Sequence, residues 1–146
     1  MNTTKTTIVL LVEDDPGDQK LVKNALADQD VTVEFHVANS GEEALEYLQH
    51  SKIGDEQSPW PNLILLDLNM PGMGGREFLK RMKADNDLCA IPVIVLTVSD
   101  SEVDIQECYR LNVAGYVQKL ASPEEFQTVV KKLAKYWSVN SAVVKS

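Results

Sequence analysis

Polar side chains that could take part in chemistry follow several apolar segments of this sequence. The apolar run Leu63–Leu66 is followed at once by Asp67, and Asn69 and a Pro-Gly pair come next. A continuous apolar run of this length is typical of a strand buried on both faces of a parallel sheet. Ligands of such sheets bind in the crevice beyond the carboxyl ends of the strands. Asp67 is therefore expected at the mouth of a crevice.

Three other apolar segments also end in polar groups. Glu13, Asp14 and Asp15 follow the first segment, Thr97 ends another, and Lys119 follows the last. In a parallel sheet these ends meet at one edge, so we expect the groups to converge on the crevice of Asp67. Several carboxylates placed together repel one another and raise each other's pKa, so the cluster needs a positive partner.

A divalent metal ion is the partner that this donor set favours. Mg²⁺ prefers oxygen ligands, takes one or two carboxylates and keeps several waters. Asp14 and Asp67 are the expected ligands, the backbone carbonyl of Asn69 reaches the ion from the turn, and Glu13 acts through water. Lys119 adds a fixed positive charge beside them.

These groups match the needs of phosphoryl transfer. The Asp67 carboxylate can act as a nucleophile and form an acyl phosphate. A metal ion and Lys119 offset charge on the phosphoryl oxygens, and the Thr97 hydroxyl can donate to one of them. Taken singly, each group has an ordinary alternative role, as a loop acid, a strand residue or a surface charge. Their coincidence at successive strand ends favours the chemical interpretation.

Composition limits the classes of function. The chain has 146 residues, 44% of them hydrophobic, which suits one domain with a sizeable core. Its 22 acidic and 14 basic residues give a net charge of −8, which disfavours direct DNA binding. No apolar run approaches the roughly 20 residues that span a bilayer, and the first residues lack a signal-peptide pattern. Cys89 and Cys108 have no metal-binding spacing, so a cytoplasmic protein with reduced thiols is expected, without membrane contact.

Strand and helix patterns alternate along the chain. Strands are expected at residues 8–12, 31–37, 63–67, 92–97 and 115–118, and residues 51–61 are expected to form a loop. Helices are expected to begin after Asp15, at the Ser40 capping box with Glu43, near Phe78, near Ser101 and at Ser122. This pattern predicts an α/β fold, a five-stranded parallel sheet doubly wound as (βα)5. The flavodoxin-like strand order 2-1-3-4-5 is the common solution for this count.

Four segments together resemble the receiver domain of two-component response regulators: residues 12–15, 66–72, 95–97 and 115–119. The resemblance covers roughly residues 8–137 and implies one receiver domain over 1–146, with a short tail at 138–146. It implies that Asp67 accepts phosphate from a histidine kinase. It further implies that Glu13, Asp14 and Asp67 hold Mg²⁺, that Lys119 contacts the phosphate, and that Thr97 and Tyr116 are the switch residues.

A narrower resemblance links the chain to the single-domain response regulators of cyanobacterial phytochromes. Residues 58–69 and Tyr136-Trp137-Ser138 carry it, and it implies a phytochrome kinase as partner. Two positions depart from the receiver pattern. Leu120 replaces the usual proline after the lysine, where a cis bond before a non-proline residue costs about 2.5–4 kcal/mol. Val98 replaces a common small residue and is expected to narrow access to the site.

The resemblance also implies a switch. Before phosphorylation, Thr97 and Tyr116 are expected to face outward. Phosphate on Asp67 would draw the Thr97 hydroxyl in, and Tyr116 would rotate into the vacated space. This motion would change the face made by the fourth helix, fifth strand and fifth helix. Without an output domain this face must signal through a partner, and we expect a homodimer that uses it together with Trp137 and the tail.

Three other functions remain open. A phosphatase of the haloacid-dehalogenase type needs a second Asp as general acid where this chain has Asn69, which cannot supply a proton and take it back. We therefore expect slow self-phosphorylation and self-dephosphorylation, and no turnover of phosphate esters. A flavodoxin-like cofactor binder needs a phosphate-cradling loop where the chain has acids at 13–15. A degenerate receiver would signal without phosphate, although all the reactive groups are present.

Overall fold

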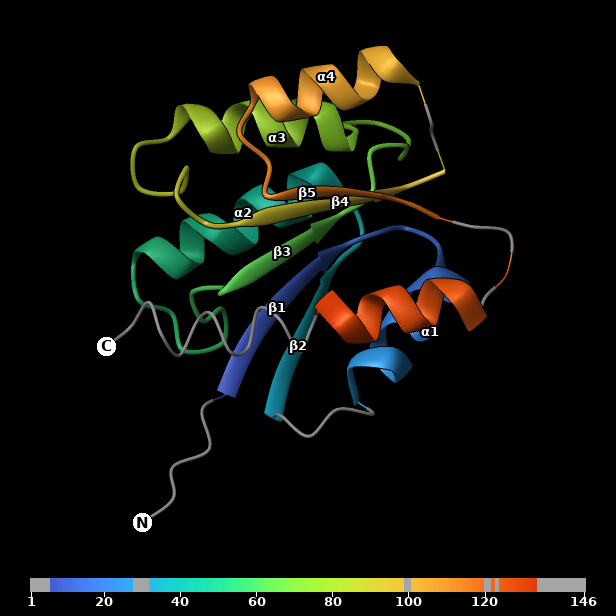
Figure 1. Cartoon of the computed structure of the whole chain (residues 1–146). Helices are drawn as coiled ribbons and strands as arrows, with labels where there is room; N and C mark the ends of the chain where they lie inside the picture. Colours follow the sequence, from blue (N-terminus) through green and yellow to red (C-terminus); the bar gives the residue numbers. More distant parts are fainter. Residues whose placement is uncertain (1–5, 28–31, 99–100, 120–121, 123, 134–146) are drawn as a thin grey trace.

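Five parallel strands form a single sheet in the computed structural model, which describes residues 6–27, 32–98, 101–119, 122 and 124–133. The strand order is β2-β1-β3-β4-β5, so the predicted doubly wound topology is confirmed (Figure 1). Every neighbouring pair of strands is parallel. The strands are β1 (Thr6–Val12), β2 (Thr32–Ala38), β3 (Leu63–Leu66), β4 (Val93–Thr97) and β5 (Gly115–Gln118).

Helices cover both faces of the sheet. They are α1 (Pro16–Ala27), α2 (Gly41–Lys52), α3 (Gly75–Ala84), α4 (Glu102–Arg110) and a last helix over residues 124–133. One apolar cluster joins the strands to α2, α3 and α4, through residues such as Leu48, Phe78 and Cys108. A second cluster joins the opposite face to α1 and the last helix, through residues such as Val22, Phe126 and Val130. The central strands β1, β3 and β4 are largely buried because each face of the sheet has its own helical layer, while the edge strands β2 and β5 are more exposed.

The helix starts follow the sequence signals with one exception. Asp15 caps α1, since its Oδ2 accepts a hydrogen bond from the Asp18 N–H at 2.8 Å. Ser40 caps α2, accepting from the Glu43 N–H at 3.0 Å. The second half of the predicted capping box is wrong, because the Glu43 carboxylate accepts from the Asn39 N–H at 3.1 Å and not from Ser40.

Strand and helix boundaries shift slightly from the predicted ones. β3 ends at Leu66, so Asp67 is the first residue after the strand. Helix α2 continues to Lys52, two residues into the segment predicted as loop. These shifts are of the size that helix fraying and ladder edges produce, and the order of elements is unaffected.

The register of the sheet brings the strand ends to one edge. Val12 pairs with Leu66 and Leu66 pairs with Val95, while Thr97 pairs with Gln118. Backbone hydrogen bonds continue the ladder one step further, from the Asp67 N–H to the Val12 carbonyl at 3.0 Å. The polar residues that follow the strands therefore share one edge, as predicted.

Several sequence predictions fall outside the described residues. These are the Lys119–Leu120 peptide bond and the positions of Tyr136, Trp137 and the tail at 138–146. Among the helices that the structure describes, none combines the length and the apolar character needed to cross a membrane.

Candidate functional site

Three carboxylates meet at the carboxyl edge of the sheet. Glu13, Asp14 and Asp67 each offer an oxygen within 4.8 Å of the others. Glu13 and Asp67 are buried, with 2% and 6% of their surface exposed, and Asp14 is the more open member. Asp15 fixes Glu13, because its N–H donates to Glu13 Oε2 at 3.2 Å. A compact set of carboxylate oxygens fits a hard divalent cation such as Mg²⁺.

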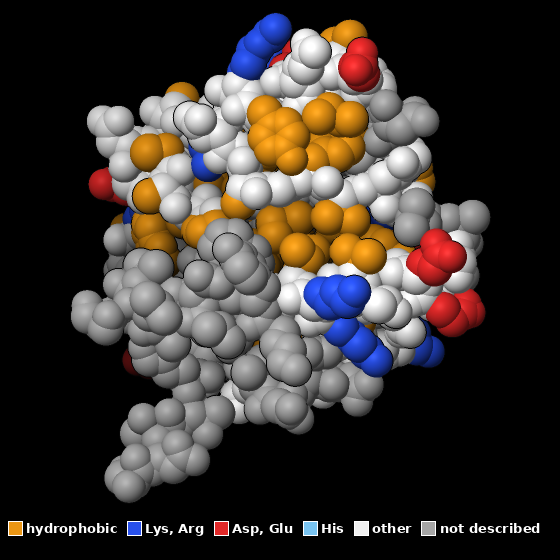
Figure 2. All heavy atoms as spheres, in the orientation of Figure 1, with side chains coloured by type: hydrophobic (Ala, Val, Ile, Leu, Met, Phe, Trp, Pro, Cys, Tyr) orange, Lys and Arg blue, Asp and Glu red, His pale blue; other side chains and the backbone are white. Residues whose placement is uncertain are grey.

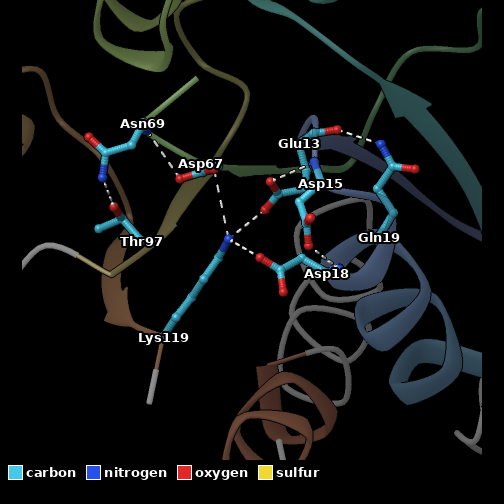
Figure 3. A network of polar contacts seen from close by, with 8 residues as sticks. All are labelled: Glu13, Asp15, Asp18, Gln19, Asp67, Asn69, Thr97 and Lys119. Carbon is cyan, nitrogen blue, oxygen red and sulfur yellow. Dashed lines mark hydrogen bonds and ion pairs between the residues drawn. The ribbon is translucent and has the colours of Figure 1, made fainter. Parts of the chain in front are cut away.

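Lys119 reaches this cluster from the end of β5 (Figure 3). Its Nζ lies 2.5 Å from Glu13 Oε1, 2.8 Å from Asp18 Oδ2 and 3.8 Å from Asp67 Oδ2. Only 10% of its side chain is exposed. Burial alone would lower the pKa of Lys119, but its hydrogen bonds to Asp18 and Glu13 outweigh burial and raise that pKa. The ammonium therefore stays charged among the acids.

Burial changes the pKa of Glu13 more than its lysine partner, Lys119, does. Burial raises the pKa of Glu13 to about 7, and the hydrogen bond and charge of Lys119 oppose this rise only in part. The nearby charge of Asp67 raises the same pKa further. Burial is therefore the main reason why Glu13 takes up a proton more readily than a free glutamate.

Asn69 and Thr97 form a second arm of the site. The Asn69 N–H donates to Asp67 Oδ1 at 3.1 Å, and its side-chain Nδ2 donates to Thr97 Oγ1 at 2.9 Å (Figure 3). Thr97 is fully buried, and the switch motion expected of it stays a prediction. The amide of Asn69 holds the hydroxyl inward by this hydrogen bond. Tyr116 is half-buried and packs against the cluster under α2, α3 and α4.

A backbone hydrogen bond joins the ends of β4 and β5, next to the side chains of Thr97 and Lys119. The Lys119 N–H donates to the Thr97 carbonyl at 2.6 Å. The reactive ammonium and the candidate switch hydroxyl therefore belong to one hydrogen-bonded pair of strand ends, and a shift of either strand end displaces both.

Two acids of the first loop and helix need separate comment. Asp15, which follows the first strand, is exposed and caps α1, as its place before Pro16 predicted. Asp18 was not considered, yet its carboxylate touches Lys119. The signal that could have identified it is an acid in the first turn of a helix that begins beside the site.

Close backbone contact fixes the segment that carries Asp67. A Cβ atom added to Gly75 would lie 2.2 Å from the Asp67 carbonyl oxygen, so only glycine fits at the start of α3. The Gly75 N–H donates to the Leu68 carbonyl at 3.2 Å. At Gly41, an added Cβ would lie 2.7 Å from the Met73 carbonyl oxygen. The loop after β3 is thus held between the first residues of α2 and α3.

Comparison with known proteins gives a consistent result. Residues 9–131 match the family model for the response regulator receiver domain. The response regulator Rcp1 of Synechocystis sp. (strain ATCC 27184 / PCC 6803 / Kazusa) is 39% identical over 131 residues, which are 89% of this chain and 88% of Rcp1.

Solved structures resemble the chain over most of its length. The phosphorylated cyanobacterial phytochrome response regulator RcpA aligns with a TM-score of 0.84 at 38% identity, covering 91% of this chain and 94% of RcpA. The Mn²⁺-bound form of Rcp1 aligns with a TM-score of 0.82 at 38% identity, covering 90% of this chain and 94% of that one. Both likenesses extend across the elements that carry the carboxylate cluster.

Proposed function

The chain belongs to the response regulator receiver domain family, and from this premise we propose that Asp67 accepts a phosphoryl group from a histidine kinase. The observation that carries the proposal is the grouping of Asp67 with two further carboxylates and with Lys119. Oxygens of Glu13 and Asp14 lie within 4.8 Å, and the Lys119 ammonium lies 3.8 Å from Asp67 Oδ2. This is a nucleophile beside the groups that neutralise charge on a phosphoryl group.

The proposed reaction moves one phosphoryl group. A carboxylate oxygen of Asp67 forms a bond to phosphorus while the bond from phosphorus to an imidazole nitrogen of the kinase breaks. The electron pair of the broken bond stays on that nitrogen, and the imidazole takes up a proton. Lys119 offsets charge on a phosphoryl oxygen, and we expect the Thr97 hydroxyl to donate to another.

We assign the metal site to the side chains of Glu13, Asp14 and Asp67 and to the carbonyl of Asn69. Bound there, Mg²⁺ supplies positive charge to an otherwise repulsive group of oxygens. The grouping of three carboxylate oxygens within 4.8 Å of one another supports this assignment. The relative solved with Mn²⁺ supports it as well.

The proposed partner is a phytochrome kinase. Its support is the resemblance to RcpA, described as a cyanobacterial phytochrome response regulator. We propose that the chain acts in the cytoplasm as one receiver domain over residues 1–146, without binding DNA. Its chemistry would be confined to slow self-phosphorylation and self-dephosphorylation.

Intact mass after incubation with Mg²⁺ and acetyl phosphate tests the central proposal. We expect one added phosphoryl group on the wild-type chain and none on Asp67→Asn. Asp87→Asn is the matched control, since it removes an equally charged but exposed acid that pairs with Lys52 and lies outside the carboxylate cluster. An unmodified wild-type chain would contradict the proposal, and steady turnover of a phosphomonoester would favour the phosphatase alternative.

We further propose a homodimer through α4, β5 and the last helix. Figure 2 shows two groups of apolar side chains on the face that presents these elements. Val103 and Tyr109 of α4 are 69% and 50% exposed, and Val98 just after β4 is 65% exposed. Exposed apolar side chains gathered on one face are typical of an interaction surface.

Sedimentation of the wild-type chain and of Tyr109→Asp tests the dimer. We expect the dimer mass for the wild type and the monomer mass for the variant, because a charge is costly to bury at an apolar interface. Ile53→Asp is the control, since Ile53 is 79% exposed but follows α2 on another part of the surface. A monomeric wild type, with and without phosphate, would contradict this interface.

A further inference from the structure

We propose that Asp18 is a positioning residue that tethers Lys119 and competes with the phosphoryl group on Asp67 for its ammonium. The inference rests on the proposed function, because it concerns the lysine of the same site. It adds to that function a restraint from α1, and it assigns a role to a side chain outside the metal and phosphate groups.

The first argument is the distribution of contacts around one ammonium group. A lysine ammonium has three N–H donors. Two of them are engaged at short range, by Glu13 Oε1 at 2.5 Å and by Asp18 Oδ2 at 2.8 Å. Asp67 Oδ2 lies 3.8 Å away, beyond hydrogen-bond distance (Figure 3). Lys119 is therefore held on the side of α1, away from the phosphoacceptor.

The second argument is that Asp18 has no other task in the carboxylate cluster. The group of oxygens suited to a cation consists of Glu13, Asp14 and Asp67, within the part of the chain that the structure describes. When a cation occupies those acids, Asp18 still has its carboxylate available for Lys119. The tether therefore persists in the metal-loaded protein, where phosphoryl transfer would take place.

The third argument is that Asp18 is fixed in place and stabilised as an anion. It is the third residue of α1, in the first turn, where the helix dipole favours negative charge. Its N–H is held by Asp15 Oδ2 at 2.8 Å. The Asp18 side chain is 34% exposed, so solvent weakens the pair without abolishing it.

The consequence is a competition that slows phosphorylation and weakens binding of a phosphoryl group. To contact a group on Asp67, the ammonium must loosen its contact with Asp18. Removing the Asp18 charge releases Lys119 toward Asp67. From the usual strength of partly exposed ion pairs, we expect a gain of about fivefold.

Two variants and one matched control test the tether. Asp18→Asn removes the charge but keeps an acceptor, and Asp18→Ala removes both. Asp87→Asn is the matched control, since it removes the charge of an exposed acid that pairs with Lys52 and does not touch Lys119. We would measure the rate of Asp67 labelling by acetyl phosphate with Mg²⁺, and the affinity for beryllofluoride, a mimic of the phosphoryl group.

We expect both Asp18 variants to label faster and to bind beryllofluoride about fivefold more tightly, and Asp87→Asn to match the wild type. Asp18→Glu restores the charge and should return both values toward the wild type. In metal-free buffer, amine-directed labelling of Lys119 should also increase in Asp18→Asn, which reports the tether without any phosphate chemistry.

Unchanged or slower labelling in both Asp18 variants would overturn the tether, and so would an equal gain in Asp87→Asn. If the wild type is labelled and the Asp18 variants behave like it, only the tether fails. If the wild type takes up no phosphate, the proposed function fails, and the tether fails with it.

Discussion

The hydroxyl of Thr97 is buried and accepts a hydrogen bond from Asn69. Asn69 is also hydrogen-bonded to the carboxylate of Asp67. Asn69 donates through its N–H to Asp67 and through its side chain to Thr97. A chain of two hydrogen bonds thus connects the carboxylate with the end of β4. If Asp67 is phosphorylated as proposed, a phosphoryl group that recruits the Thr97 hydroxyl would have to replace its hydrogen bond to Asn69.

Replacing Thr97 tests this connection. Thr97→Ala leaves the Asn69 amide without its hydroxyl partner in a partly buried place, and we expect the free energy of unfolding to fall by about 1–2 kcal/mol. Thr97→Ser keeps the hydroxyl and should lose less. Urea denaturation measures both variants. Equal stability of Thr97→Ala and the wild type would show that the hydrogen bond has no structural weight.

At the residue scale, sequence identified the positions but not all the contacts. Asp67, Glu13 and Lys119 were predicted to converge because each follows an apolar segment, and strand ends of a parallel sheet share an edge. Asp18 was missed because its contact depends on where a long lysine side chain comes to rest, and no spacing rule encodes that. The hydrogen bond from Asn69 to Thr97 was missed for a similar reason, since it depends on where the Asn69 side chain comes to rest.

At the scale of elements, α3 begins against the backbone of Asp67. Gly75 allows this approach, because any side chain would meet the Asp67 carbonyl oxygen. Helix α3 and Asp67 are therefore in direct backbone contact, so the position of α3 limits where Asp67 can lie.

Gly75→Ala should disturb both stability and the site. The added methyl group cannot fit at 2.2 Å from a backbone oxygen, so the loop or the helix must move. We expect the free energy of unfolding to fall by about 1–3 kcal/mol, as overpacking usually costs, and phosphorylation of Asp67 to slow. Thermal melting and acetyl phosphate labelling measure the two effects.

Gly115→Ala is the control for this change. An added Cβ there would lie 3.6 Å from Ile94, an ordinary contact, so a much smaller effect is expected. Equal effects at the two glycines would contradict the role given to Gly75.

The sequence predicted helix and strand boundaries closely where capping residues or apolar runs mark them. The caps at Asp15 and Ser40 located two helix starts, and the apolar runs located the buried strands. The contact of the Glu43 carboxylate with the Asn39 N–H in place of the Ser40 N–H was not predictable from the residue types alone. The strand order came from the common solution for five units and not from pairing signals in the strands.

At the scale of the whole molecule, the chain carries a net charge of −8 and gathers three carboxylates at one edge of its sheet. This cluster works against folding through repulsion. A bound cation reverses the effect, because any ligand that binds only the folded state stabilises it.

Mg²⁺ should therefore raise the melting temperature. At about 100 times its Kd the ion adds about 2.7 kcal/mol to the free energy of unfolding. Asp14→Asn should lose this response, yet melt at or above the wild-type temperature in a chelator, because one repulsive charge is gone. Asp87→Asn has the same net charge and should keep the full response to Mg²⁺. A response retained by Asp14→Asn would remove this residue from the metal site.

Successive side chains along each strand point to opposite faces of the sheet, and this has a consequence for engineering the protein. Neighbouring residues of β5 serve opposite layers, since Tyr116 packs toward α2, α3 and α4 while Val117 packs toward α1 and the last helix. In β4, Val95 belongs to the first layer and Leu96 to the second. A mutant library that randomises only Leu96 and Val117 would therefore change the packing against α1 and the last helix, while the side chains of Val95 and Tyr116 keep their contacts in the first layer.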